Sequence, residues 1–182
     1  MKYADIKKYD ISNGVGIRVS LFVSGCNHHC KGCFNPEAWD FNYGKDFTDD
    51  TIDEIIEALK PNYINGLSLL GGEPLDIKNQ DGILKLLKKL KKVYPEKSIW
   101  CYSGYQYEYL LEQSKTNQVT NEIISCLDIL VDGKFEIEKK DITLLFRGSS
   151  NQRIIDVKKS LEENKIVLSE KNRRRNEDAV KC

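Results

Sequence analysis

Stretches with the composition of buried strands alternate with amphipathic stretches along most of this chain, and the alternation restricts the folds open to it. GIRVSLFVSG (16–25) precedes TDDTIDEIIEALK (48–60), and GLSLLGGEP (66–74) precedes DGILKLLKKLKKVYP (81–95). The first stretch of each pair is short and apolar, whereas the second repeats its apolar residues at helical spacing. The same patterns predict strands at 98–105 and 128–135, two short strands separated by a polar turn within 143–157, and helices at 107–115 and 120–127.

Strands that are joined through helices run parallel. We therefore expect an α/β fold in which helices flank a parallel sheet, either open or curled into part of a barrel. Such folds bind ligands at the carboxyl ends of their strands. The unusual clusters of this sequence all follow predicted strands, namely GCNHHCKGC, LGGEP, CYSGY, LVDGKF and FRGSSNQ. The pattern thus predicts one shared site at this rim of the sheet.

Composition narrows the setting in which the protein works. The 182 residues suit one domain, and the 28 basic residues balance the 28 acidic ones, which gives no reason to expect nucleic acid as a partner. No apolar run approaches the ~20 residues that span a bilayer, and the start, MKYADIKKYD, has no apolar h-region. We expect a cytoplasmic protein with no membrane contact, whose six cysteines are reduced thiols or ligands.

The composition changes near residue 158. From there to the end the sequence has eight basic and five acidic residues with weak apolar periodicity. We therefore expect a folded unit over residues 1–157 and a charged, flexible tail over 158–182. The NRRRN cluster within this tail is either a solvated face or a contact for an acidic partner.

Three cysteines lie close together in GCNHHCKGCFN (25–35), and no fourth joins them. Cys26, Cys30 and Cys33 form a C-x3-C-x2-C pattern that can present three thiolates to one [4Fe–4S] cubane and leave the fourth iron open to a ligand. The alternative is a zinc site completed by His28 or His29. Structural zinc sites generally use two separated ligand pairs, and either ring would strain this short loop, so we expect the two histidines to face solvent or to act as outer donors.

The cysteine pattern resembles the signature of the radical S-adenosylmethionine superfamily. The resemblance implies a partial (β/α) barrel, and it implies that S-adenosylmethionine binds the open iron through its amino and carboxylate groups. Reduction of the cluster would then cleave the cofactor to a 5′-deoxyadenosyl radical. The GGEP turn (71–74) is similar to the superfamily turn that contacts the cofactor amino group through its backbone, which implies cofactor-binding roles for Gly71, Gly72 and Glu73.

The flanks of the loop resemble the glycyl-radical-enzyme activases. Their signature is matched by Gly14, Gly16, Arg18, Phe22, Gly25, Cys26, Cys30, Cys33 and Asn35. DILVDGKF and RGSSNQ are similar to the branch that activates anaerobic ribonucleoside-triphosphate reductases, and the likeness runs from Tyr3 to Val157. It implies hydrogen abstraction from a glycine Cα in the large reductase subunit, with a flavodoxin-like protein as electron donor.

Further cofactor-binding residues follow from the resemblance. Many superfamily loops carry an aromatic residue before the last cysteine, where this chain has Gly32, so Phe34, after Cys33, is expected to pack by the adenine. Asp132 and Lys134 resemble an acid–lysine pair beside the site of related activases, and Ser103 is expected to bind ribose or carboxylate. The alternatives are a surface ion pair for Asp132 and Lys134 and a polar turn for Ser103.

Three functions fit the sequence. The first is activation of an anaerobic ribonucleotide reductase. The second is a radical S-adenosylmethionine enzyme that acts on another glycyl-radical enzyme, such as one of the pyruvate formate-lyase type, or on a small molecule. The third is a zinc or iron–sulfur module without catalysis.

The spacing of the cysteines leads to a test of the cluster ligands. Replacing Cys26, Cys30 or Cys33 with Ala should lower the iron bound after anaerobic reconstitution and abolish cofactor cleavage, because each thiolate is expected to hold one iron. Cys101→Ala and Cys126→Ala serve as controls and should leave the cluster in place. A full cluster in any one of the three loop variants would remove that cysteine from the ligand set.

Overall fold

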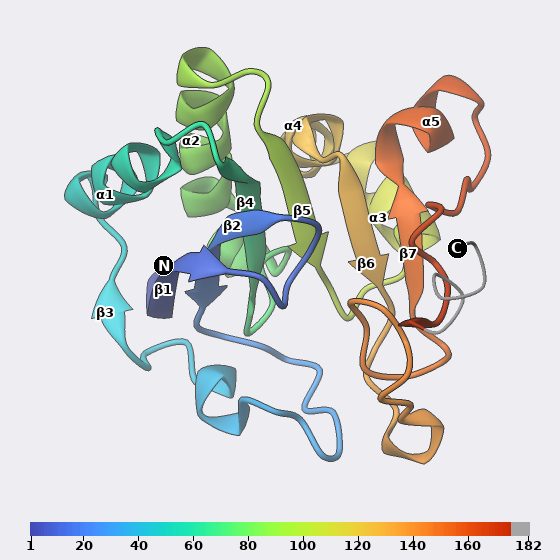
Figure 1. Cartoon of the computed structure of the whole chain (residues 1–182). Coiled ribbons are helices and arrows are strands. Elements are labelled where there is room, and N and C mark those ends of the chain that lie inside the picture. Colours follow the sequence, from blue (N-terminus) through green and yellow to red (C-terminus); the bar gives the residue numbers. More distant parts are fainter. Residues whose placement is uncertain (176–182) are drawn as a thin grey trace.

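The computed structural model describes residues 1–175, so Cys182 and the end of the predicted tail lie outside the described residues. The elements, in chain order, are β1 (Lys2–Asp10), β2 (Ile17–Val23), η1 (Pro36–Trp39), β3 (Lys45–Asp46), α1 (Asp49–Leu59), β4 (Ile64–Gly71), α2 (Ile77–Val93), β5 (Ser98–Tyr102), α3 (Tyr107–Ser114), α4 (Gln118–Cys126), β6 (Ile129–Asp132), η2 (Ile137–Lys139), β7 (Arg153–Asp156) and α5 (Val157–Glu162). The helices flank one twisted sheet (Figure 1). No described helix is long and apolar enough to span a bilayer.

The sheet has seven strands in the order β3-β1-β2-β4-β5-β6-β7. The four central strands β2, β4, β5 and β6 are parallel, whereas β1, β3 and β7 pair antiparallel to their neighbours. The predicted α/β fold with flanking helices is confirmed, but the sheet is mixed rather than wholly parallel. It is not closed, since β3 and β7 form its edges. The partial barrel stays a prediction.

The predicted helices form where their apolar faces meet the sheet. In α1 the buried residues Ile52, Ile55, Ile56 and Leu59 share one face, and Thr48 caps the helix by accepting a hydrogen bond from the backbone N–H of Thr51. Helix α2 begins at Ile77, four residues before the predicted start at 81, because the side chain of Asp76 accepts from the N–H of Lys78. One continuous hydrophobic core joins these helices to the central strands.

Arg18 is buried in this core and is 1% exposed. Its guanidinium donates to the hydroxyls of Ser68 and Ser98 and to the carbonyls of Val15, Leu67 and Ser98, and it lies over the ring of Trp100. Burial lowers the pKa of Arg18 to about 10. The guanidinium thus ties β2 to β4 and β5 through neutral acceptors.

The chain shows no structural break at residue 157. Helix α5 starts there, and residues 163–175, which we call the C-terminal segment, then run back along β7. The N–H of Asp156 donates to the carbonyl of Val167, and the N–H of Ser169 donates to that of Ile154. The described part of the predicted tail is therefore folded, because its backbone satisfies the hydrogen-bonding groups of the edge strand β7.

The C-terminal segment also pairs with residues 143–145, where we had predicted a strand. That stretch is a loop that makes only an isolated bridge, Leu144 to Arg174. Asn172 joins the two parts, since its Oδ1 accepts from the N–H of Ile154 and from the guanidinium of Arg147. Local periodicity carries no information about these contacts, which explains why the sequence predicted a solvated tail.

Asn172 offers a test of this packing. Asn172→Ala should lower the free energy of unfolding by about 1–3 kcal/mol, because it leaves the buried N–H of Ile154 without its acceptor. Glu170→Ala, at an exposed carboxylate of the same segment, should stay within about 0.5 kcal/mol of the unchanged protein. Urea unfolding measures both. Equal stability of Asn172→Ala and the unchanged protein would show that the segment does not support the fold.

Candidate active site

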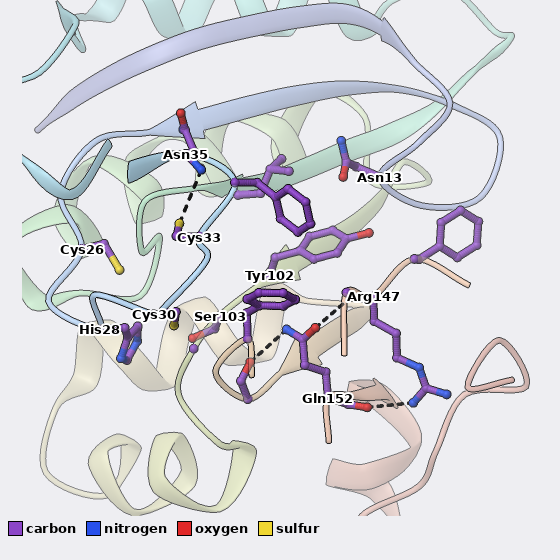
Figure 2. A pocket seen from close by; sticks show the side chains of 18 of the residues that line it. Asn13, Cys26, His28, Cys30, Cys33, Asn35, Tyr102, Ser103, Arg147 and Gln152 are labelled. Carbon is purple, nitrogen blue, oxygen red and sulfur yellow. Dashed lines mark hydrogen bonds between the residues drawn. The ribbon is translucent and has the colours of Figure 1, made fainter. Parts of the chain in front are cut away.

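The loops that follow β2, β4, β5 and β6 lie at one end of the sheet (Figure 1) and surround a cavity of about 640 Å³. All five clusters that the sequence placed at strand ends contribute to its wall. Figure 2 shows Cys26, Cys30 and Cys33 on one side of the cavity and Arg147 on the other, with Tyr102 between them. The clusters therefore meet around one cavity at the carboxyl ends of the strands, where the sequence predicts a shared site.

The three cysteines receive backbone N–H groups at their sulfur atoms. Burial raises the pKa of Cys26 to about 11, and the N–H groups of His28 and His29 act against this shift. Burial likewise raises the pKa of Cys30, and the N–H of Phe135 opposes it. The N–H of Asn35 donates to Cys33 Sγ at 3.4 Å. Such donors stabilise the thiolate form that iron requires, so the donor set fits an iron–sulfur cluster.

The thiols do not form a compact single-ion site. Within residues 1–175 no three His, Cys, Asp or Glu side chains converge closely enough to hold one metal ion. His29 is exposed, and its ring lies 4.8 Å from that of Trp39. Its φ of 47° is a left-handed conformation, which His tolerates better than most residues.

We call residues 24–35, which contain the three cysteines, the cysteine loop, and we call residues 71–74 the glycine turn. The two touch backbone to backbone: the N–H of Gly72 donates to the carbonyl of Val23 at 2.7 Å, and the N–H of Glu73 donates to that of Gly25 at 2.8 Å. A Cβ on Gly72 would lie 2.5 Å from the Gly25 carbonyl oxygen, and Gly71 has a φ of +106°. The glycines are needed for this close approach, and both also line the cavity.

The side chain of Glu73 turns into the protein. It is 1% exposed, and its two oxygens accept hydrogen bonds from Leu75, Ser103 and Gly104 and contact His28 Nε2. Glu73 lines the cavity, but the sequence did not reveal this set of donors. Of the two roles that the sequence left open for His28, solvent exposure is excluded because the side chain is 8% exposed, and its contact with Glu73 fits the outer donor role.

The structure brings together some of the other predicted residues and separates others. Ser103 lines the cavity, and its hydroxyl donates to Glu73. Asp132 is buried and pairs with Arg153 instead of Lys134, so the expected acid–lysine pair does not form. Lys134 is exposed, and its charge opposes the rise in the pKa of Cys30 that burial causes.

Phe34 belongs to the cavity lining, whereas Gly32 does not. Phe34 lines the cavity and is 74% exposed, with its ring 5.4 Å from that of Phe135. Gly32 has a φ of +75°, and a Cβ there would approach the Ile137 side chain.

Tyr102 is a cavity residue that was not among the predicted site residues. Its hydroxyl is buried and has no hydrogen-bond partner among the described residues, and its ring lies in the middle of the cavity (Figure 2). Burial raises the pKa of Tyr102, which keeps the phenol protonated as a donor. The sequence feature that could have indicated this position is that Tyr102 ends β5, because the ends of parallel strands present side chains to ligands.

Comparisons with known proteins agree with this geometry. The family described as "4Fe-4S single cluster domain" matches residues 12–155, so the fold and the site belong to an iron–sulfur protein of that family. A protein of Pasteurella multocida (strain Pm70) is 40% identical over 156 residues, 85% of this chain and 96% of its own length. One of Escherichia coli (strain K12) is 42% identical over 154 residues, 84% of this chain and 96% of its own.

A third relative, from Enterobacteria phage T4, is 39% identical over 154 residues, 85% of this chain and 93% of its own. All three bear the name anaerobic ribonucleoside-triphosphate reductase-activating protein. The chain belongs to the family of anaerobic ribonucleoside-triphosphate reductase-activating proteins.

The backbone contact leads to a prediction at Gly72. Gly72→Ala should shift the cysteine loop, because the added Cβ would lie 2.5 Å from the Gly25 oxygen and 2.9 Å from that of Ala38. We expect a loss of about 1–3 kcal/mol in the free energy of unfolding and less iron bound after reconstitution. Gly82→Ala is the matched control, since its Cβ would meet only the flexible Met1 side chain. Full iron content in Gly72→Ala would show that the loop position does not depend on this contact.

Proposed function

We propose that this protein activates the large subunit of an anaerobic ribonucleoside-triphosphate reductase by generating a glycyl radical on it. Cys26, Cys30 and Cys33 would hold one [4Fe–4S] cluster, and S-adenosylmethionine would bind its open iron. When bound, this pair supplies a 5′-deoxyadenosyl radical that abstracts the hydrogen atom. The observation that carries the proposal is that three cysteines of one loop line the cavity. Among the described residues 1–175, no fourth cysteine belongs to the cavity wall.

The residues of the chain would bind and shield the reactants. Gly71 and Gly72 line the cavity beside the cysteines and carry no side chain, so a ligand can reach the backbone there. Ser103 and Tyr102 offer hydroxyl groups, and the buried Tyr102 phenol is a free donor for a ligand oxygen. Phe135, Phe146 and Leu144 provide apolar walls that exclude water, and exclusion of water protects a reactive radical.

The reductase would present its glycine as a polypeptide segment at the open side of the cavity. Phe34 and Ile142 line the cavity and are 74% and 80% exposed. Exposed apolar side chains at the rim of a site suit a protein partner. We propose that Gly32, Phe34 and Lys134 lie on the side of this rim where the cofactor binds. We also propose that a flavodoxin-like protein is the electron donor.

The architecture of the activase is part of the proposal. The curved sheet and its helices would form a partial (β/α) barrel of the radical S-adenosylmethionine type. The catalytic unit would comprise residues 1–157, which carry every motif, together with the folded C-terminal segment. The names of the relatives favour the reductase as substrate over another glycyl-radical enzyme or a small molecule.

The test uses the full chain, reconstituted anaerobically with iron and sulfide and mixed with S-adenosylmethionine, reductant and the purified large reductase subunit. We expect a glycyl radical signal on the subunit in electron paramagnetic resonance and an equivalent amount of 5′-deoxyadenosine. Cys26→Ala should abolish both, and Cys101→Ala should retain both. Cofactor cleavage without a radical on the reductase would exclude this substrate, and a colourless protein that binds zinc but no iron would exclude the chemistry.

A further inference from the structure

Four hydrogen-bond donors converge on the buried carboxylate of Glu73. Oε1 accepts from the N–H of Leu75 and from the hydroxyl of Ser103, each at 2.9 Å. Oε2 accepts from the N–H of Gly104 at 2.7 Å and lies 2.8 Å from His28 Nε2. Because an ionised carboxylate only accepts hydrogen bonds, His28 donates in this contact. We call Glu73 and these four donors the Glu73 hub.

The hub joins three segments that are far apart in the sequence. Leu75 follows the glycine turn, and Ser103 and Gly104 follow β5. Only His28 comes from the cysteine loop. A second side chain of that loop, Asn27, donates to Asp76 at 2.7 Å, but Asp76 serves as the cap of α2 and does not line the cavity.

The ring of His28 is fixed from several sides. It meets the ring of Tyr105 edge to face at 4.5 Å. A Cβ on Gly104 would lie 2.3 Å from His28 Cδ2, so the imidazole packs directly on the backbone of the β5 turn. This packing and the bond to the buried carboxylate hold the His28 ring in one orientation. The position of Glu73 therefore determines where this part of the cysteine loop lies.

We infer that His28 is a positioning residue for the proposed reaction. It holds the cysteine loop, which would carry the cluster, at a fixed distance from the glycine turn, which would bind the amino group of the cofactor. The inference rests on the proposed function for the identity of the two ligands. The side-chain link from His28 to Glu73 adds to the backbone bonds that Gly72 and Glu73 make at the start of the loop, and it is observed whatever the two ligands are.

The hub requires a carboxylate side chain at residue 73. Each carboxylate oxygen accepts two donors, so an amide in either orientation would set its NH2 group against two donors. Glu73→Gln has nearly the same shape and yet should disturb the site as strongly as loss of His28. A residue that acted only by filling space would tolerate this change.

The experiment compares His28→Leu, His28→Gln and Glu73→Gln, with His29→Asn as the control, in the full chain reconstituted with iron and sulfide. Gln places its Nε2 four bonds from Cα, as His does, so it can restore the donor. Asn at position 29 tolerates the left-handed φ of 47°. The readouts are iron content, hydrogen–deuterium exchange of residues 26–33, and the titration of the reduced-cluster resonance with S-adenosylmethionine.

We expect full iron content in all four variants, because the cysteines are intact and, unlike Gly72→Ala, none of the four adds a Cβ against the backbone of the cysteine loop. His28→Leu and Glu73→Gln should exchange at least ~10-fold faster in the loop and bind S-adenosylmethionine at least ~10-fold more weakly, the loss typical of a hydrogen bond to a charged group. His28→Gln should recover most of both losses, and His29→Asn should match the unchanged protein.

Unchanged exchange in His28→Leu, or no rescue by Gln, would overturn the inference. If His28→Leu does not fold, Ser103→Ala decides, because it removes one donor from the other oxygen: faster loop exchange supports the hub, and unchanged exchange refutes it. If the unchanged protein does not bind S-adenosylmethionine, the proposed function fails, while the exchange data still report on the hub.

Discussion

The site depends on a close contact between two backbones. Strands β2 and β4 are parallel and in register, so Val23 at the end of one lies beside Gly71 at the end of the other. The chain segments that leave these strands must therefore pass each other at hydrogen-bonding distance, with no room for side chains at Gly71 and Gly72. The cysteine loop and the glycine turn are one structural unit, although 35 residues lie between them in the sequence.

Two buried charges stabilise opposite ends of the central strands. Arg18 lies near the start of β2 and donates only to hydroxyls and carbonyls, while Glu73 follows β4 and accepts from two N–H groups, a hydroxyl and an imidazole. A buried charge is tolerated when its hydrogen-bonding capacity is filled. Arg18 is satisfied mainly by acceptors on β4 and β5, and Glu73 by donors in the segments that follow β2, β4 and β5, so each charge links neighbouring parts of the sheet.

The C-terminal segment connects the edge of the sheet to the wall of the cavity. It lies beyond residue 155, where the match to the family ends, yet it covers β7 and pairs with residues 143–145. Asn172 and the ion pair between Arg174 and Asp141 link it to the loop that forms the far wall. The shape of that wall therefore depends on residues outside the shared family domain.

The sequence by itself determined the order of most strands and helices and the cysteines of the site. Apolar periodicity reports local burial, and Cys26, Cys30 and Cys33 are close in the chain, so their spacing carries the chemistry directly. It also placed Gly71, Gly72, Glu73 and Ser103 at strand ends that meet in the structure.

Only the tertiary structure decided which of these groups touch. The bond between His28 and Glu73, the pairing of Asp132 with Arg153 in place of Lys134, and the folding of residues 163–175 onto β7 all join segments that are distant in sequence. The periodicity of a sequence records which face of an element is buried, but not which partner lies against it. Long-range register and side-chain packing supply that information. They decided between the solvent-facing and the donor role of His28, and they fold residues 163–175 of the predicted tail onto β7.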